Sequence, residues 1–172
     1  MEFQGYVHVY TGNGKGKTTA ALGLLLRASG AGMKVFLGQF LKRGEYSEHA
    51  ALALLPGVTV EAFGGERRVG APLTGEDTVH ARKGLERLRE AVSSGNWGLV
   101  IADEIFVAVH LGLLAETDVL ELLEVRHPST ELVLTGRYTF PEILRRADLV
   151  TEMKELRHYF SRGVPARKGI EK

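Results

Sequence analysis

Short runs of β-branched, aromatic and aliphatic residues alternate along the chain with longer segments whose apolar residues recur at helical spacing. This alternation is typical of βαβ units, in which helices join parallel strands and cover both faces of a sheet. The runs predict six strands, at residues 5–10, 35–40, 58–63, 98–103, 131–135 and 148–154. The segments 99–102 and 132–134 are continuously apolar, which indicates central, buried strands. The sequence therefore predicts an α/β fold with a mostly parallel sheet of about six strands.

Helical spacing predicts five helices between these strands, at residues 17–29, 47–55, 78–93, 116–126 and 140–146. The first helix should stop at Gly30 and Gly32, because glycine commonly ends a helix. The predicted buried stripe of the helix at 78–93 consists of Val79, Leu85, Leu88 and Val92. The charged residues between them are predicted to face water.

The connection at residues 64–76 carries four glycines and one proline without any periodicity. These features predict a long mobile loop within a compact domain. Loops of this length are often functional, but a plain connection between a strand and a helix would have the same composition. Both interpretations stay open at this point.

Length and composition narrow the class of protein. The chain has 172 residues, which suffices for a single domain, 1–172, with a sizeable core. Its 22 lysines and arginines nearly balance 21 aspartates and glutamates, which argues against nucleic acid or an anionic membrane as partner. The absence of cysteine excludes disulfides, thiolate metal ligands and a cysteine nucleophile, and it fits a reducing compartment. No basic leader and no apolar run near the roughly 18 residues of a membrane span are present, so we expect a cytoplasmic protein.

A glycine-rich turn lies between the first predicted strand and the first predicted helix. It reads Thr11-Gly12-Asn13-Gly14-Lys15-Gly16-Lys17-Thr18-Thr19. A strand, a glycine-rich turn and a helix form the context of a Walker A, or P-loop, motif. The glycines let backbone N–H groups approach phosphate oxygens, the helix N-terminus adds donors, and Lys17 adds a full positive charge. Residues 12–19 are therefore a candidate ATP site, with the Thr18 hydroxyl as a ligand for Mg²⁺ or Mn²⁺.

Two further features bear on this interpretation. The Walker A consensus begins with glycine, whereas this chain has Thr11 there and Gly12 one place later. The strand at 98–103 delivers Asp103 and Glu104 at its carboxyl end, where ligands of parallel sheets bind, so these acids are Walker B candidates for the metal. A turn that binds nothing and a surface pair of acids are the plain alternatives. The six histidines show no metal-ligand spacing.

Four blocks, taken in order, closely resemble the P-loop type of ATP:cob(I)alamin (corrinoid) adenosyltransferases over nearly the whole chain. They are residues 10–21 with the Thr11 variant, Gln39-Phe40-Leu41-Lys42, Asp103-Glu104, and the C-terminal segments 132–137, 147–153, 157–158 and 163–171. The resemblance implies transfer of the 5′-deoxyadenosyl group of ATP to the cobalt of a reduced corrinoid, with triphosphate leaving. It also implies that ATP lies in the reverse sense to ordinary P-loop enzymes and that the protein is a homodimer. A flavoprotein is the candidate reductant.

On this resemblance, backbone donors at residues 13–18 and the lysines of the loop bind the triphosphate, and the metal is held by Thr18 with Asp103 or Glu104. Reduced cobalt is itself a nucleophile, so the protein must orient the 5′ carbon and stabilise a highly charged leaving group. The candidate catalytic residues are Lys17, Arg137 and Glu104. The candidate substrate-pocket residues are Glu48, Phe63, Arg157 and His158, for some of which an exposed ion pair is the alternative.

The family also has an aromatic Phe-x-Trp-Glu segment after its third strand, where this chain has Phe63-Gly64-Gly65-Glu66. The resemblance implies that this segment helps to remove the lower axial ligand of cobalt. Either other groups, such as the loop at 64–76, do this here, or the physiological substrate differs. Two other functions stay open. An ATPase or kinase would act at the γ-phosphate with Glu104 as base beside a metal-binding Asp103. A non-catalytic ATP-binding switch or corrinoid carrier would bind without turnover.

Overall fold

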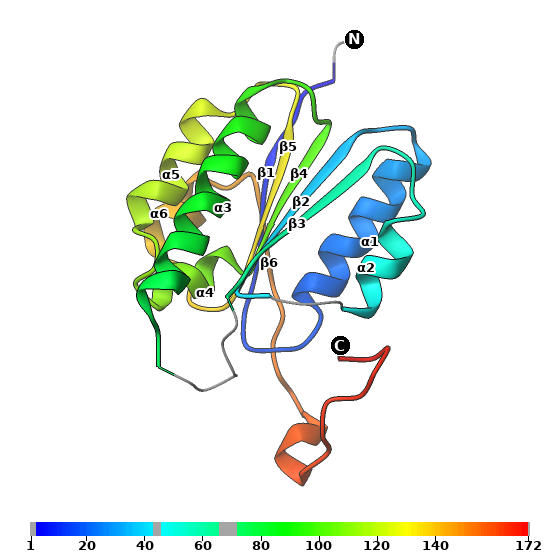
Figure 1. Cartoon of the computed structure of the whole chain (residues 1–172), viewed down its shortest axis with the longest axis vertical. Helices are drawn as coiled ribbons and strands as arrows, with labels where there is room; N and C mark the ends of the chain where they lie inside the picture. Colours follow the sequence, from blue (N-terminus) through cyan, green and yellow to red (C-terminus); the bar gives the residue numbers. More distant parts are fainter. Residues whose placement is uncertain (1–2, 43–45, 66–71, 172) are drawn as a thin grey trace.

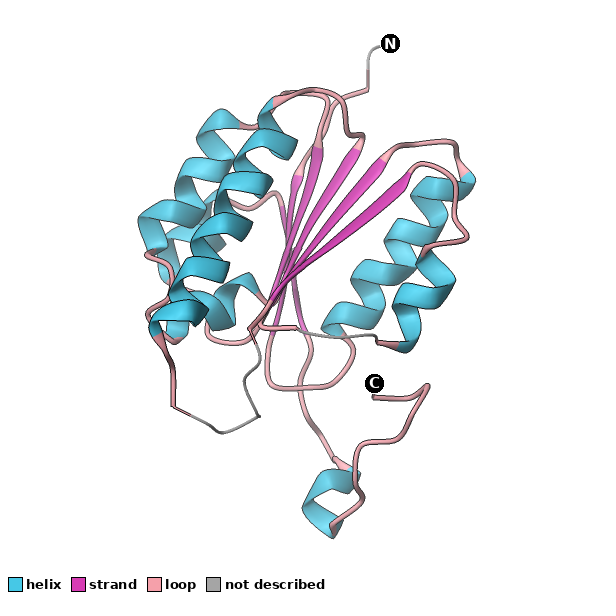
Figure 2. Ribbon diagram, in the orientation of Figure 1, coloured by secondary structure: helices cyan, strands magenta, loops and turns pink. Residues whose placement is uncertain are grey.

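The computed structural model describes residues 3–42, 46–65 and 72–171, which form a six-stranded parallel sheet between two layers of helices (Figures 1 and 2). The strands are β1 (Val7–Thr11), β2 (Val35–Phe40), β3 (Val58–Phe63), β4 (Leu99–Asp103), β5 (Glu131–Thr135) and β6 (Leu149–Glu152). The helices are α1 (Lys17–Gly30), α2 (Ser47–Leu52), α3 (Gly75–Ser93), α4 (Ile105–His110), α5 (Glu116–Val125) and α6 (Pro141–Arg146), followed by a 3₁₀ turn, η1 (Tyr159–Arg162). Helices α1 and α2 cover one face and α3 to α6 the other, which confirms the predicted fold class.

The strand order is β3-β2-β4-β5-β1-β6, so β4 and β5 lie between β2 and β1. All neighbouring strands are parallel, and their carboxyl ends therefore share one edge of the sheet. The loop after β1 and the C-terminal tail both lie at this edge (Figure 1). Such an edge is where open α/β sheets bind ligands.

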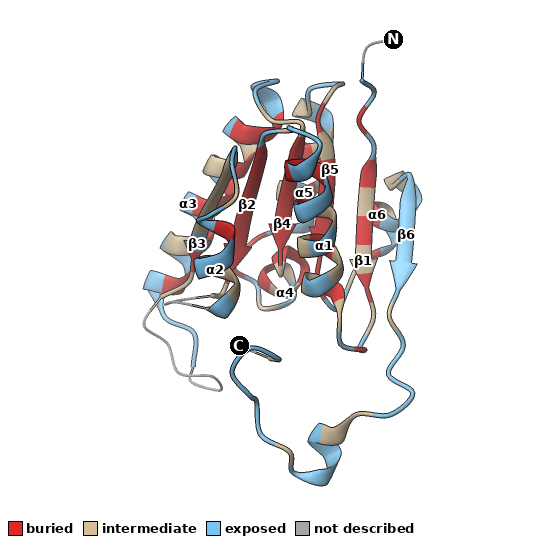
Figure 3. Ribbon diagram, turned by 90° about the vertical axis from the view of Figure 1, so that its right-hand side faces the viewer, coloured by how far each residue is buried: buried red, intermediate tan, exposed pale blue. Residues whose placement is uncertain are grey.

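The core lies on both faces of the central strands. Strands β2 and β4 are buried at every residue, whereas β6 is exposed throughout (Figure 3). Phe36, Phe40 and Phe106 fill the layer beneath α3 to α6, and Ala21 and Leu25 of α1 pack on the opposite face. Burial on both faces explains why the sequences of the central strands are continuously apolar.

Helix α3 buries the predicted stripe except at its first member. Val79 is 67% exposed, so its predicted place on the buried stripe is wrong, although the other three members of the stripe are buried. The residues that face the sheet include Ala81 and Gly84. A Cβ on Gly84 would lie 2.5 Å from the Phe63 ring, so the helix turns its small residues toward that ring and Val79 toward solvent.

Other differences concern element boundaries. Helix α3 begins at Gly75, three residues before its predicted start, because the Asp77 carboxylate accepts the Thr74 backbone N–H at 2.8 Å and caps the helix. Helix α2 ends at Leu52, and the short helix α4 was not predicted. Part of the predicted loop at 64–76, residues 66–71, lies outside the described residues, so its role stays a prediction.

Candidate functional site

The glycine-rich turn forms a cradle between β1 and α1 and rests on the segment after β6. Gly12 and Gly16 have φ angles of 95° and 119°, which residues with a side chain rarely adopt. Gly14 donates its N–H to the Met153 carbonyl at 2.7 Å, and the Met153 N–H donates to the Thr11 carbonyl at 2.8 Å. The C-terminal part of the chain thus holds the phosphate loop in shape.

We expect Gly14→Ala to weaken nucleotide binding by roughly 10- to 100-fold, the effect of a steric cost of about 1–3 kcal/mol. A Cβ at Gly14 would lie 2.7 Å from the Met153 carbonyl oxygen, so either the loop or its support must move. The matched control is Gly23→Ala in α1, where a Cβ meets nothing within 4 Å and alanine favours the helix. Equilibrium titration with a fluorescent ATP analogue measures both variants. Wild-type affinity in Gly14→Ala would contradict the packed cradle.

Lys17 stands inside the cradle at the first position of α1. Its ammonium donates to the carbonyls of Gly12 and Gly14, each at 2.7 Å, and the residue is only 6% exposed. Burial lowers the pKa of Lys17, and the nearby charge of Arg137 lowers it further. A polyphosphate bound here would offset both effects, because its negative charge favours the charged form of the lysine.

Asp103 is the buried centre of the site. Its Oδ1 atom accepts hydrogen bonds from the hydroxyls of Thr18 at 2.8 Å and Thr135 at 2.7 Å. Its Oδ2 atom accepts from the Gln39 amide at 3.1 Å and lies 3.0 Å from Lys42 Nζ. The side chain is fully buried, so these donors replace water around the carboxylate. The carboxylate in turn fixes the Thr18 hydroxyl and the Lys42 ammonium.

Glu104 brings a second acid to the same edge from a left-handed backbone conformation with φ of 61°. Its N–H donates to Thr135 Oγ1 at 3.0 Å. Burial raises the pKa of Glu104, and the charge of Asp103 raises it further. Leu41 and Tyr138, just beyond the carboxyl ends of β2 and β5, also have φ near +60° (60° and 62°). Strained backbone of this kind gathers at ligand sites, and here it marks three of the strands that form the edge.

The oxygen atoms at this edge fit a hard divalent cation. Because the Thr18 hydroxyl donates its hydrogen bond to Asp103, its oxygen lone pairs stay available for a metal ion. Glu104 lines the adjoining cavity and offers a second oxygen ligand. Within the described ranges, no group of three or more His, Cys, Asp or Glu side chains could hold a metal. Mg²⁺ needs no such cage, since it usually takes one or two protein oxygens together with phosphate oxygens and water.

A cavity of about 650 Å³ connects the cradle with α2 and the C-terminal tail, a size suited to a nucleotide-sized ligand. Its lining residues are Gly14, Lys15, Gly16, Lys17, Thr18, Thr19, Leu22, Lys42, Tyr46, Ser47, Glu48, Glu104, Arg137, His158, Gly169, Ile170 and Glu171. The structure therefore brings most of the predicted loop residues together with Glu48, Glu104, Arg137 and His158.

Five predicted site residues do not line the cavity, and the fully buried Asp103 is one of them. Gly12 and Asn13 belong to the loop but do not line the cavity, and the exposed Arg157 does not line it either. Phe63 is 5% exposed and packs against Phe40 with ring centroids 5.6 Å apart, so it is a core residue and not part of the pocket wall. The reason is that the last residue of β3 faces the layer of α3.

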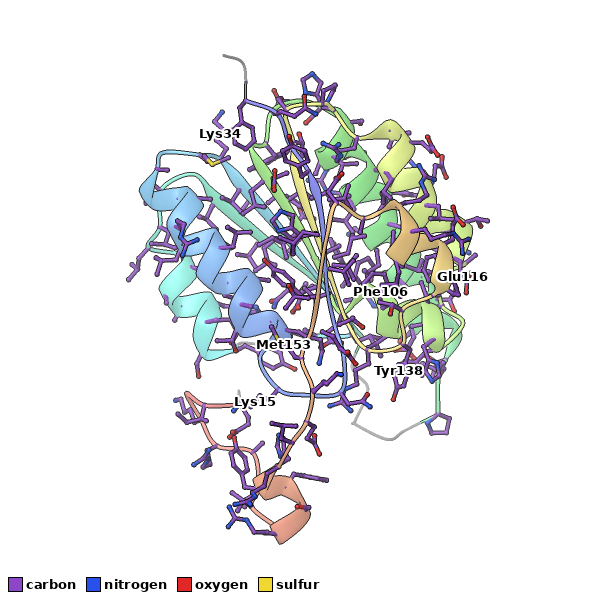
Figure 4. The ribbon with its side chains drawn as sticks, turned by 180° about the vertical axis from the view of Figure 1, so that it is seen from behind. Lys15, Lys34, Phe106, Glu116, Tyr138 and Met153 are labelled. Atoms are coloured by element: carbon purple, nitrogen blue, oxygen red, sulfur yellow. The ribbon has the colours of Figure 1, made fainter. Side chains whose placement is uncertain are left out.

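The tail closes over the cradle through Lys15, which Figure 4 shows pointing toward it. Lys15 Nζ donates to Glu171 Oε1 at 2.6 Å, to the Tyr159 hydroxyl at 2.9 Å and to the Ile170 carbonyl at 3.1 Å. Hydrogen bonds from Arg167 and then Lys15 hold the pKa of Glu171 well below its ordinary range. Lys15 must therefore exchange a carboxylate of the tail for phosphate oxygens if it is to bind ATP.

Sequence reasoning missed Lys42 and Gln39 as site residues, although both stand in one of the family blocks. Gln39 joins Asp103 to His49, whose Nε2 atom lies 2.6 Å from the Gln39 side-chain oxygen. Their place at the carboxyl end of a predicted strand could have indicated this, because the carboxyl ends of parallel strands lie together and Gln39 pairs with Asp103. Glu48 pairs with Lys42 at 3.2 Å, inside the cavity rather than on the open surface.

The chain is similar to known proteins over nearly its whole length. Residues 3–171 match the model of the family ATP:corrinoid adenosyltransferase BtuR/CobO/CobP. A corrinoid adenosyltransferase of Pseudomonas aeruginosa is 33% identical over 170 residues, covering 98% of this chain and 84% of the relative. An uncharacterized protein of Nostoc sp. is 36% identical over 90% of this chain, which spans only 45% of that relative. A solved KaiC-like protein of Pyrococcus horikoshii shares the fold, with a TM-score of 0.57 and 19% identity over 87% of this chain and 73% of that one.

Proposed function

The chain belongs to the ATP:corrinoid adenosyltransferase family BtuR/CobO/CobP, an enzyme family of ATP-dependent corrinoid adenosylation, and we propose that its cradle at residues 11–18 holds the triphosphate during that reaction. The observation that carries this proposal is that Lys17, Thr18 and Arg137 line one cavity, while the buried Asp103 accepts the Thr18 hydroxyl from behind the cavity wall. Lys17 and Thr18 come from the cradle, Asp103 from β4 and Arg137 from the end of β5. Lys17 and Arg137 thus present positive charge where a polyanion would lie.

The reaction asks for charge stabilisation rather than for a protein nucleophile. A pair of electrons from the reduced cobalt of the corrinoid substrate forms the bond to C5′, the C5′–O5′ bond breaks, and its electron pair leaves with the triphosphate. The chain has no cysteine, and the described site needs no other nucleophile for this step. Lys17, Arg137 and the loop N–H groups orient the triphosphate and neutralise the charge that develops on it.

The metal, the subunit arrangement and the partners extend the same proposal. Thr18 and Glu104, or Asp103, would hold Mg²⁺ or Mn²⁺, which when bound supplies positive charge to the phosphate oxygens. Reverse-sense ATP binding, a homodimer, a flavoprotein reductant and a cytoplasmic location stay predictions from the family resemblance. In the described part of the chain, no helix has the length and apolar character needed to cross a bilayer.

We expect the protein, supplied with ATP, Mg²⁺ and chemically reduced cobalamin, to release inorganic triphosphate and form a light-sensitive cobalt–carbon product in equal amounts. The expectation follows from attack at C5′, which leaves the three phosphates joined. Ion chromatography identifies the phosphate product, and the visible spectrum before and after illumination follows the corrinoid. A reaction without reduced cobalamin is the control.

Other products would contradict the proposal in distinct ways. Release of ADP and phosphate without any need for the corrinoid would indicate an ATPase or kinase that acts at the γ-phosphate. Binding of ATP and corrinoid without any product would indicate a switch or a carrier.

A further inference from the structure

Lys42 adds a partly buried cation to the cavity from the end of β2, a strand that does not carry the phosphate loop. It follows Leu41, whose φ of 60° turns the chain at the end of β2, and β4 and β5 separate β2 from β1. The Lys42 side chain is 15% exposed and lines the same cavity as the cradle. A positive charge therefore borders the cavity at the β2 end, away from Lys15 and Lys17.

Two carboxylates and an aromatic ring hold the Lys42 ammonium in place. Its Nζ atom lies 3.0 Å from Asp103 Oδ2 and 3.2 Å from Glu48 Oε1, and 5.1 Å from the centroid of the Tyr46 ring. Burial by itself lowers the pKa of Lys42, but Asp103 and Glu48 outweigh burial and raise the pKa above its ordinary value. The group is therefore charged at neutral pH. An ammonium has three donors, so it can bind an anion without releasing both carboxylates.

The ammonium groups of the three lysines that line the cavity have different partners before a ligand binds. Lys15 is engaged by the tail carboxylate of Glu171, and Lys17 donates to carbonyls of its own loop. Lys42 is fixed by the buried network around Asp103 before any ligand arrives. Groups fixed in advance stabilise developing charge best, because they need no reorganisation during the reaction.

Building on the proposed function, we propose that Lys42 is a further catalytic residue that contacts the triphosphate from the β2 end of the cavity. As the C5′–O5′ bond breaks, its electron pair passes to the departing oxygen while an electron pair from the corrinoid cobalt forms the new bond to C5′. The Lys42 ammonium donates a hydrogen bond to the triphosphate and keeps its proton throughout. No reactant beyond ATP and the reduced corrinoid is required.

The test is calorimetric titration of inorganic triphosphate into wild-type protein, Lys42→Gln and the control Lys34→Gln. Lys34 is exposed and stands just before β2, at the opposite end of the strand from Lys42 (Figure 4). The glutamine at position 42 retains a donor for Asp103 but removes the charge. We expect Lys42→Gln to bind triphosphate roughly 10- to 100-fold more weakly, the usual effect of losing a hydrogen bond to a charged group, and Lys34→Gln to bind it unchanged.

A purely structural role for Lys42 gives a different result. Lys42→Gln would then unfold at lower urea concentration but bind triphosphate as tightly as the wild type, and this outcome would overturn the proposal. Lys42→Met, which removes the donor as well, serves as a second variant and should lose triphosphate affinity at least as strongly.

The same titration separates this inference from the proposed function. If Lys17→Ala loses triphosphate binding while both Lys42 variants keep it, only the role of Lys42 is wrong. If the wild-type protein binds no triphosphate at all, the proposed site and the role of Lys42 are both wrong.

Discussion

Lys17→Ala is expected to slow corrinoid adenosylation by roughly 10²- to 10³-fold while leaving the protein folded. The substitution removes the ammonium that lies 2.7 Å from two loop carbonyls and that would face the triphosphate as it leaves. Because the charge acts on the leaving group, we expect the loss in kcat and not only in ATP affinity. Initial rates of triphosphate release at saturating ATP and reduced cobalamin measure the effect.

Lys34→Ala is the matched control, since it removes an exposed lysine at the far edge of the sheet and should turn over like the wild type. Thermal denaturation of both variants reports whether the fold is intact. Turnover at the wild-type rate by folded Lys17→Ala would show that this lysine does not stabilise the leaving group.

Asp103→Asn should lower the free energy of unfolding by about 3 kcal/mol, as expected for the disruption of a buried, hydrogen-bonded charge pair. The Asp103 carboxylate accepts hydrogen bonds from two hydroxyls on Oδ1, and its Oδ2 atom accepts a hydrogen bond from Gln39 and forms an ion pair with Lys42. An asparagine has one acceptor oxygen, so in either orientation its NH₂ group would face donors. The Lys42 ammonium would also lose its buried counter-charge. Urea denaturation followed by circular dichroism measures the change.

Glu104→Gln provides the comparison, because it neutralises the adjacent acid. Burial and the charge of Asp103 both disfavour the ionised Glu104, so removing its charge should leave the free energy of unfolding unchanged or slightly higher. Equal stability of Asp103→Asn and the wild type would mean that the network around Asp103 does not stabilise the fold. The site would then need another explanation for how Thr18 and Lys42 are held.

The strands were predictable because their signal is local. A strand of a parallel sheet that is buried on both faces must be apolar along its length, and β4 and β5 show this in sequence as they do in burial. The cradle was predictable for a similar reason. Its glycines and the lysine before Thr18 form a continuous pattern whose geometry is fixed by short-range backbone constraints.

Other elements depend on contacts that the local sequence does not contain. Helix α4 has six residues, of which only the last, His110, is polar, and it packs beside β5. Its sequence resembles the continuation of a buried strand. The orientation of α3 depends on the Phe63 ring at the end of β3, against which Gly84 of the helix packs closely. Val79 was misplaced because helical spacing gives a stripe but not the neighbour that the stripe meets.

The sequence by itself determined the P-loop, the order of the strands and of all helices but α4 along the chain, and the family to which its motifs belong. Only the tertiary structure decided which charges meet there. The strand order brings Asp103 between the cradle and Lys42, and the returning tail places Glu171 on Lys15, far away along the chain. The physical reason is that side-chain chemistry and backbone preference are local properties, whereas the distance between two charges depends on how the whole sheet packs.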